Sequence, residues 1–172
     1  MILETEHLFL RPLSEYELNG PYVSWLNDHD VCRYNSHGVS EYTRKQAELF
    51  IKDLAADKSR EVFAVYLKGV TEHLGNISLQ RIDYGNRSAE IAFLFGNKKY
   101  WGRGYAVEAG ERLLQRAYED LRLHRVYFGT HIENIAMQRV GEKLGFQKEG
   151  ILKDAQFKNG CFNDIILYGK VR

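Results

Sequence analysis

Residues 98–108 read KKYWGRGYAVE, and this stretch decides which fold the sequence predicts. Two glycines, Gly102 and Gly104, flank one arginine where a strand-like apolar run ends and a helical period begins. Glycine lets a backbone approach a ligand closely, and the free N–H groups at a helix start attract anions. Positive charge is added by Lys98, Lys99 and Arg103. The stretch therefore predicts a phosphate-binding turn, with a plain glycine turn and solvated basic residues as the alternative.

Two other phosphate-binding motifs are excluded by residue type. A P-loop needs Gly-Lys followed by Ser or Thr, and this tripeptide occurs nowhere in the chain. A dinucleotide-binding fold needs a third glycine three residues after the second one, and Val107 stands at that position. ATP and NAD are therefore poor candidates for the ligand of this turn.

Upstream of the turn, apolar residues alternate with their neighbours, which is the period of a β-strand. One run starts at Glu61, a second follows around Ile77, and a third reads SAEIAFLF over residues 88–95. We expect Gly69 and Gly75 to separate the first run from the second. These three runs predict neighbouring strands of one sheet.

The amino-terminal part predicts one strand and two helices. A run that alternates around Leu8 ends at Pro12, which is typical of a short opening strand. Two capping boxes then mark helix starts, because each pair satisfies N–H groups that a helix end leaves free. The capping boxes are Ser14 with Glu17, and Thr43 with Gln46.

Downstream of the turn, apolar residues recur at helical spacing, so a long helix is expected to begin near Gly104. HRVYFGTH, residues 124–131, predicts the next strand. Asn134 is expected to cap a further helix, which Gly145 ends in a left-handed turn. The dipeptide Asn159-Gly160 indicates a closing hairpin. The predicted order is strand, two helices, three strands, helix, strand, helix and hairpin.

The composition is that of an ordinary globular protein of 172 residues, with 24 Lys and Arg against 23 Asp and Glu. This balance gives no global field for nucleic acid or for an anionic membrane surface, so neither is expected as a direct partner. No apolar run approaches the roughly 20 residues that a membrane helix needs. Cys32 and Cys161 form no CxxC pair, which fits a reducing, cytoplasmic setting better than a disulfide or zinc framework.

In these motifs the chain resembles the GNAT acetyltransferase family, whose pyrophosphate-binding motif is Gln/Arg-x-x-Gly-x-Gly/Ala. Here residues 99–104 read KYWGRG, with lysine in place of the usual Gln or Arg. The segment ENIAMQRVGEKLGF, residues 133–146, resembles the family's Asn-containing segment followed by Glu-Lys-Leu-Gly-Phe. The opening LFLRPL and the closing NGCFNDIILYGKVR extend the resemblance over essentially the whole chain. It is strongest to the branch of bacterial ribosomal-protein N-terminal acetyltransferases.

The resemblance implies one α/β (α+β) GNAT domain over residues 1–172, with a mixed, mostly antiparallel sheet of about seven strands and about four helices. It implies acetyl-coenzyme A as co-substrate and no metal. The backbone of residues 95–97 would pair with the pantetheine arm, and residues 99–106 would enclose the pyrophosphate. Asn134 would lie near the cofactor. The alternative is that it is a helix cap and nothing more, and the two roles can coexist. The implied cofactor-binding residues are Phe95, Gly96, Asn97, Lys99, Gly102, Arg103, Gly104, Tyr105, Ala106, Asn134, Arg139 and Lys143.

Glu90 is the candidate catalytic base, since an amine must lose a proton when it is acetylated. Its side chain is expected to face away from Ala89 and Ile91, and it resembles the glutamate that many family members use. The alternative is a solvent-facing strand carboxylate. The family's usual general acid is a tyrosine, and Gly141 stands at that position, so no acid is assigned.

The predicted activity is acetyl transfer to a primary amine by direct attack in a ternary complex. The favoured acceptor is a protein N-terminal α-amine, as the resemblance implies. The alternatives are a polyamine, a nucleotide-linked amino sugar, or a coenzyme A-binding sensor without catalysis, which the glycine at position 141 favours. A monomer or a homodimer is expected. His29, Asp30 and His37 are interpreted as surface residues and not as metal ligands.

Overall fold

The computed structural model describes residues 1–172 and contains one eight-stranded sheet in the order β1-β2-β3-β4-β5-β6-β8-β7. The strands are β1 (Leu3–Glu4), β2 (Leu8–Pro12), β3 (Glu61–Leu67), β4 (Glu72–Asp83), β5 (Ser88–Leu94), β6 (Arg125–His131), β7 (Gln147–Lys158) and β8 (Cys161–Val171). All neighbours pair antiparallel except β5 and β6, so the mixed, mostly antiparallel α/β sheet that was predicted is confirmed. The additional strand is β1, whose two residues are too short to show a period.

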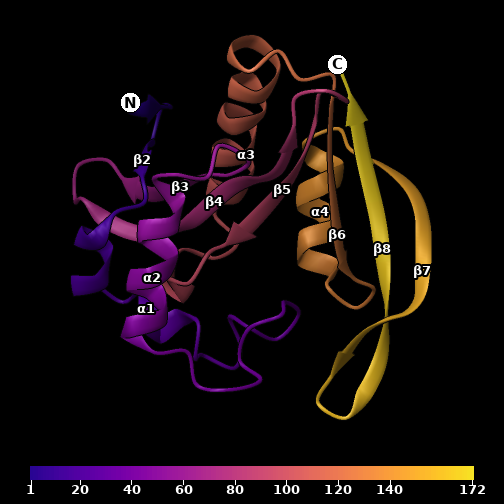
Figure 1. Cartoon of the computed structure of the whole chain (residues 1–172), viewed down its shortest axis with the longest axis horizontal. Helices are drawn as coiled ribbons and strands as arrows, with labels where there is room; N and C mark the ends of the chain where they lie inside the picture. Colours follow the sequence, from indigo (N-terminus) through magenta and orange to yellow (C-terminus); the bar gives the residue numbers. More distant parts are fainter.

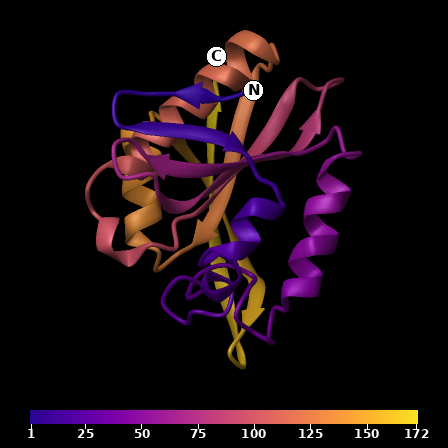
Figure 2. The ribbon, with the colours of Figure 1, turned by 90° about the vertical axis from the view of Figure 1, so that its left-hand side faces the viewer.

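Four α-helices cover the two faces of this sheet (Figure 1). They are α1 (Tyr22–Trp25), α2 (Arg44–Leu54), α3 (Tyr105–Gln115) and α4 (Ile135–Lys143). Short turns of other helix types are η1 (Glu15–Asn19), η2 (Lys98–Tyr100) and η3 (Arg116–Asp120). Helices α1 and α2 lie on one face and α3 and α4 on the other, as the turned view in Figure 2 also shows.

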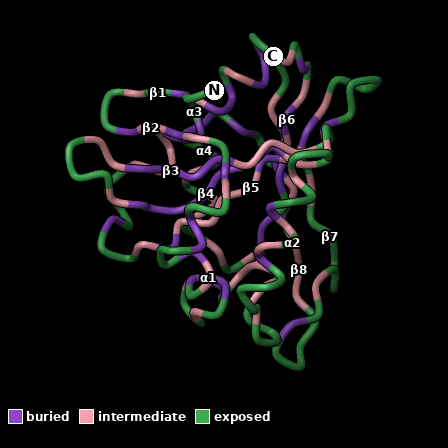
Figure 3. Tube along the Cα trace, turned by 60° about the vertical axis from the view of Figure 1, so that its left-hand side comes forward, coloured by how far each residue is buried: buried purple, intermediate pink, exposed green.

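The alternation of side chains along β3 explains why the protein has two hydrophobic cores. Phe63 and Val65 point into the larger core, beside α3 and α4, whereas Ala64 and Tyr66 point into the smaller core under α1 and α2. A central strand that is covered on both faces is therefore apolar at successive positions. In contrast, β7 lies at the sheet edge and is exposed over most of its length (Figure 3).

Most predicted helix and turn signals are confirmed. Both capping boxes are present, at the starts of η1 and α2. Gly145 has a φ of 79°, as expected for a residue that ends α4, and Asn159 and Gly160 form the tight turn between β7 and β8. Gly69 lies in the turn between β3 and β4 with a φ of 84°.

Gly75 was predicted to separate two strands, and this prediction is wrong, because Gly75 lies inside β4. An added Cβ there would lie 2.3 Å from the carbonyl oxygen of Leu94 and 2.6 Å from the Cα of Phe95. The glycine is therefore needed because the end of β5 passes very close to β4. Close approach of two backbones and a chain break favour the same residue, so the sequence alone does not distinguish them.

The parallel pair β5 and β6 is joined over only part of its length. Three register pairs connect the strands: Ser88 with Arg125, Ala89 with Val126, and Glu90 with Tyr127. Beyond Glu90 and Tyr127 the two strands have no pairing, and Figure 1 shows them diverging from this end. The sheet therefore opens between Ile91–Leu94 on one side and Phe128–His131 on the other, and one backbone edge of each strand is left unpaired.

Candidate active site

The predicted phosphate-binding turn connects β5 to α3. Gly102 and Gly104 have φ values of 74° and 87°, a region that side chains other than glycine rarely adopt, and nothing lies within 4 Å of a Cβ added to either. None of the backbone N–H groups of residues 102–106 donates a hydrogen bond within the protein. Five successive free N–H groups at the start of an eleven-residue helix form a cradle suited to an anion.

Two of the three basic side chains beside this turn are already paired. Lys98 Nζ lies 2.8 Å from a carboxylate oxygen of Asp28 and 3.0 Å from one of Asp30, and these contacts raise the pKa of the lysine. Lys99 Nζ lies 3.3 Å from Glu72, which also accepts a hydrogen bond from the Tyr100 hydroxyl.

Arg103 makes no ion pair, and its guanidinium lies 5.4 Å from the centre of the Tyr100 ring. It is therefore the basic residue of the turn with its charge free for a phosphate, whereas Lys99 must first leave Glu72.

The backbone of residues 95–97, which was predicted to pair with pantetheine, is partly occupied. The indole of Trp101 donates to the Phe95 carbonyl at 2.8 Å, and the Asn97 N–H donates to the Leu74 carbonyl at 3.0 Å. Gly96 packs flat against Trp25, so close that an added Cβ would overlap the indole. Immediately before this segment, Ile91–Leu94 pairs with β4 on one side only. The other side, which faces β6, has no strand partner. Trp101 lies within the quoted motif, yet nothing in the sequence indicated this contact.

Glu90 lies on the last rung at which β5 and β6 are joined, opposite Tyr127. It faces away from the buried Ala89 and Ile91, as expected, and its side chain is 25% exposed. Arg81 Nη1 lies 3.3 Å from one of its carboxylate oxygens, and the Arg81 side chain is 77% exposed. This partner was not predicted, because it depends on an irregularity in the pairing of β4 and β5 after Gln80. Because the Arg81 side chain is exposed, its ion pair with Glu90 is weak and is easily broken. The Glu90 carboxylate therefore stays able to accept a proton.

Side chains on the Glu90 face of the opened sheet are partly apolar and partly polar, and β4 contributes Asn76, Ser78 and Gln80 to it. Register places Tyr127, Gly129 and His131 of β6 on this face, next to Ile165 and Leu167 of β8. His131 Nδ1 accepts a hydrogen bond from the Glu133 N–H at 3.0 Å, which leaves Nε2 as the protonated nitrogen of the neutral ring. Ala92 and Leu94 continue the same face along β5.

Asn134 caps α4, as was predicted. Its side-chain oxygen accepts a hydrogen bond from the Met137 N–H at 3.2 Å, and its amide donates to Thr130 Oγ1 at 3.1 Å. The capping role is thus present, and a contact with the cofactor stays a prediction. Arg139 is exposed on the same helix, and Lys143 lines a hollow of about 620 Å³ together with Gly104.

Gly141, at the position of the family's tyrosine, is buried where α4 packs on β6. A Cβ added to it would lie 2.5 Å from a ring carbon of Phe128. That ring is itself held between Tyr168 and Phe146, so no side chain fits at this position without moving the aromatic core. The glycine therefore has a packing reason, and no general acid replaces the tyrosine there.

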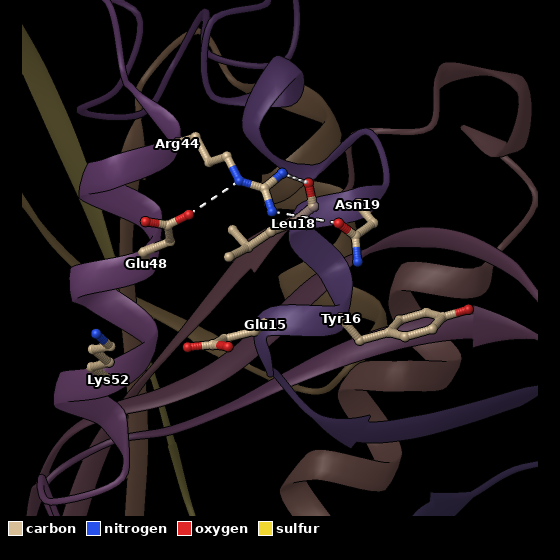
Figure 4. A pocket seen from close by; sticks show the side chains of 7 residues that line it. All are labelled: Glu15, Tyr16, Leu18, Asn19, Arg44, Glu48 and Lys52. Atoms are coloured by element: carbon tan, nitrogen blue, oxygen red, sulfur yellow. Dashed lines mark hydrogen bonds and ion pairs between the residues drawn. The ribbon is translucent and has the colours of Figure 1, made fainter.

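A further hollow of about 310 Å³ lies between η1 and α2, away from these residues (Figure 4). Arg44 crosses it, donating to the Leu18 carbonyl at 2.8 Å and lying 3.1 Å from Glu48. No group of three His, Cys, Asp or Glu side chains anywhere in the protein is arranged to hold a metal ion. None of the helices has the length and apolar character that crossing a bilayer requires.

Comparison with known proteins identifies the family whose members resemble this chain in sequence and fold. The model of the acetyltransferase (GNAT) domain matches residues 7–147. Spermidine N(1)-acetyltransferase of Escherichia coli K12 is 30% identical over 158 residues, which cover 91% of this chain and 82% of that protein. Ribosomal-protein-serine acetyltransferase of the same strain is 30% identical over 100 residues, which cover 58% of this chain and 55% of that protein.

The fold is shared as well. The crystal structure of an acetyltransferase (GNAT family) from Bacillus anthracis superposes with a TM-score of 0.85 at 26% identity, covering 99% of this chain and 98% of that one. The similar proteins thus agree on acetyl transfer, and two of them are named for different acceptor amines.

Proposed function

Since this chain belongs to the GNAT acetyltransferase family, we propose that it transfers the acetyl group of acetyl-coenzyme A to a protein N-terminal α-amine. The resemblance noted in the sequence is confirmed, and the chain is an acetyl-coenzyme A-dependent N-acetyltransferase. The acceptor amine and the role of each residue are our proposal. We also infer that residues 1–172 act as one domain, because β7 and β8 beyond the family match belong to the same sheet.

The free N–H groups of residues 102–106 and the Arg103 guanidinium would hold the pyrophosphate. The unpaired edge at Ile91–Leu94 would receive the pantetheine arm as an added strand, and this arm leads from the turn toward the rung of Glu90. The thioester would then lie beside the Glu90 carboxylate, where the sheet opens.

At that point the amine nitrogen attacks the thioester carbonyl carbon, and the carbon–sulfur bond breaks to release coenzyme A. Glu90 accepts the proton that the nitrogen loses, directly or through a water. The thiolate leaves without a protein acid, because a thiol is a good leaving group and Gly141 offers none.

The observation that carries the acceptor assignment is the small number of carboxylates on the face around Glu90. Beyond the last joined pair of residues, the strand positions on this face carry no carboxylate apart from Glu90, which is itself paired with Arg81. The nearby carboxylates Asp28 and Asp30, in the loop after α1, are both paired with Lys98. A polyamine has several cationic nitrogens and needs several carboxylates, whereas a peptide terminus has one amine on a partly apolar chain. An α-amine has a pKa of about 8, so part of it is neutral at cellular pH and one carboxylate suffices.

The test is a competition between short peptides starting with Ala or Ser, spermidine and a nucleotide-linked amino sugar at equal concentration. We expect the peptides to have the highest kcat/KM, measured as acetylated product of each class by mass spectrometry. If the peptides are the slowest class, the N-terminal assignment is wrong, and the class that wins identifies the acceptor.

A further inference from the structure

The loop that joins α1 to α2, residues 27–42, contains no regular helix or strand. Its two ends are tied together by Asn27, whose amide donates to the Tyr42 carbonyl at 2.8 Å and whose oxygen accepts from the Tyr42 N–H at 2.7 Å. In Figure 1 the loop leaves the foot of α1 and reaches toward the β7–β8 hairpin. The loop therefore runs from the part of the sheet that ends with β5 to the part that begins with β6.

Side chains from both sides of the opening hold this loop. On the β5 side, Lys98 pairs with Asp28 and Asp30 of the loop. On the β6 side, the Tyr34 ring lies against the His131 ring with a centroid separation of 5.1 Å. The loop thus bridges the open end of the sheet, next to the face on which Glu90 lies.

The third anchor is Lys158 of β7, which is only 7% exposed. Its ammonium lies 2.5 Å from the carbonyl oxygen of Cys32, 2.6 Å from that of Asn35 and 2.7 Å from that of His37. An ammonium has three N–H donors, and here each carbonyl receives one. A neutral amine has only two, so the three contacts require the charged form.

These carbonyls belong to an irregular loop that offers them few partners of its own. Burial lowers the pKa of Lys158 from its ordinary value. Hydrogen bonds donated by the charged form of a side chain favour that form. Without the ammonium, three carbonyls would point at one another inside the protein, and the loop would have to rearrange to reach water.

We propose that Lys158 is a positioning residue that fixes loop 27–42 across the open end of the sheet and thereby shapes the acceptor site. The inference rests on the proposed active site at Glu90 and holds for whichever amine is acetylated. Lys158 acts through the loop: it keeps Tyr34 against His131, beside the face where the acceptor must lie. The cofactor turn at residues 102–106 makes no contact with it.

The test compares Lys158→Met with Lys153→Met, which removes an exposed lysine from the same strand. The acceptor is the amine that the unaltered enzyme acetylates fastest, so a wrong acceptor class does not affect the outcome. We expect Lys158→Met to raise the KM of the acceptor by about tenfold or more, with a smaller change in kcat and an unchanged Kd for acetyl-coenzyme A. Amide hydrogen exchange of residues 32–37 should become faster.

Lys153→Met should leave the acceptor KM, kcat, the Kd for acetyl-coenzyme A and the hydrogen exchange of residues 32–37 unchanged. Faster exchange of the loop with an unchanged acceptor KM would overturn the proposal. If Lys158→Met does not fold, Asn27→Ala opens the same loop from its base and must raise the acceptor KM in the same way. An unchanged KM in that folded variant would equally overturn it.

Discussion

Replacing Gly104 with glutamate is expected to weaken acetyl-coenzyme A binding by about 10² to 10⁴-fold, because it removes hydrogen bonds to a charged group that contribute about 1.5–3 kcal/mol each. The new side chain would project beside the five free N–H groups of residues 102–106, and its charge would oppose the pyrophosphate. Isothermal titration calorimetry with acetyl-coenzyme A measures the effect directly.

Gly160→Glu is the matched control for this variant. Gly160 also has a left-handed backbone, with a φ of 78°, and open space around an added Cβ, but it lies at the tip of the β7–β8 hairpin. The two variants share the backbone strain and the added charge, so a difference between them reports on the turn. Unchanged affinity in folded Gly104→Glu would show that the pyrophosphate does not bind there.

The second large effect is expected from Glu90→Gln, which keeps the shape of the side chain and removes its ability to accept a proton. Turnover at neutral pH should fall by roughly 10² to 10⁴-fold, the usual contribution of a general base. The Kd of acetyl-coenzyme A should stay nearly the same, because Glu90 lies at the joined end of β5 and not at the turn. Steady-state kinetics with the preferred acceptor, together with calorimetry, separates the two quantities.

Glu149→Gln controls for the loss of an arginine–carboxylate pair. Glu149 pairs with Arg125 as Glu90 pairs with Arg81, but it lies on β7, at the edge of the sheet. We expect this variant to keep full turnover. A Glu90→Gln enzyme as fast as the unaltered one would remove Glu90 from the mechanism and leave solvent water as the proton acceptor.

Features that depend on neighbouring residues were predictable from the sequence. The turn at Gly102 and Gly104 depends on residue type and on a change of period over a few positions, and both are visible in the chain. Capping boxes and the Asn159-Gly160 hairpin are local in the same way. For the same reason Asn134 was correctly expected to cap α4, since a helix cap acts within one turn.

Features that join distant parts of the chain were not predictable. Lys158 meets carbonyl oxygens more than a hundred residues earlier, and nothing in either segment indicates the other. The Arg81–Glu90 pair depends on a register shift in a hairpin, which moves a side chain without a change in hydrophobic pattern. Contacts made by backbone carbonyls, and shifts in strand register, do not depend on a recognisable pattern of residue types, so the sequence does not predict them.

The site as a whole is tested most directly by a crystal structure of the protein with coenzyme A. The account predicts the pyrophosphate against the N–H groups of residues 102–106, with Arg103 beside it. It also predicts the pantetheine arm along Ile91–Leu94, between β5 and β6, and the thiol near Glu90. Coenzyme A bound elsewhere, with the opening between the two strands left empty, would contradict the central claim.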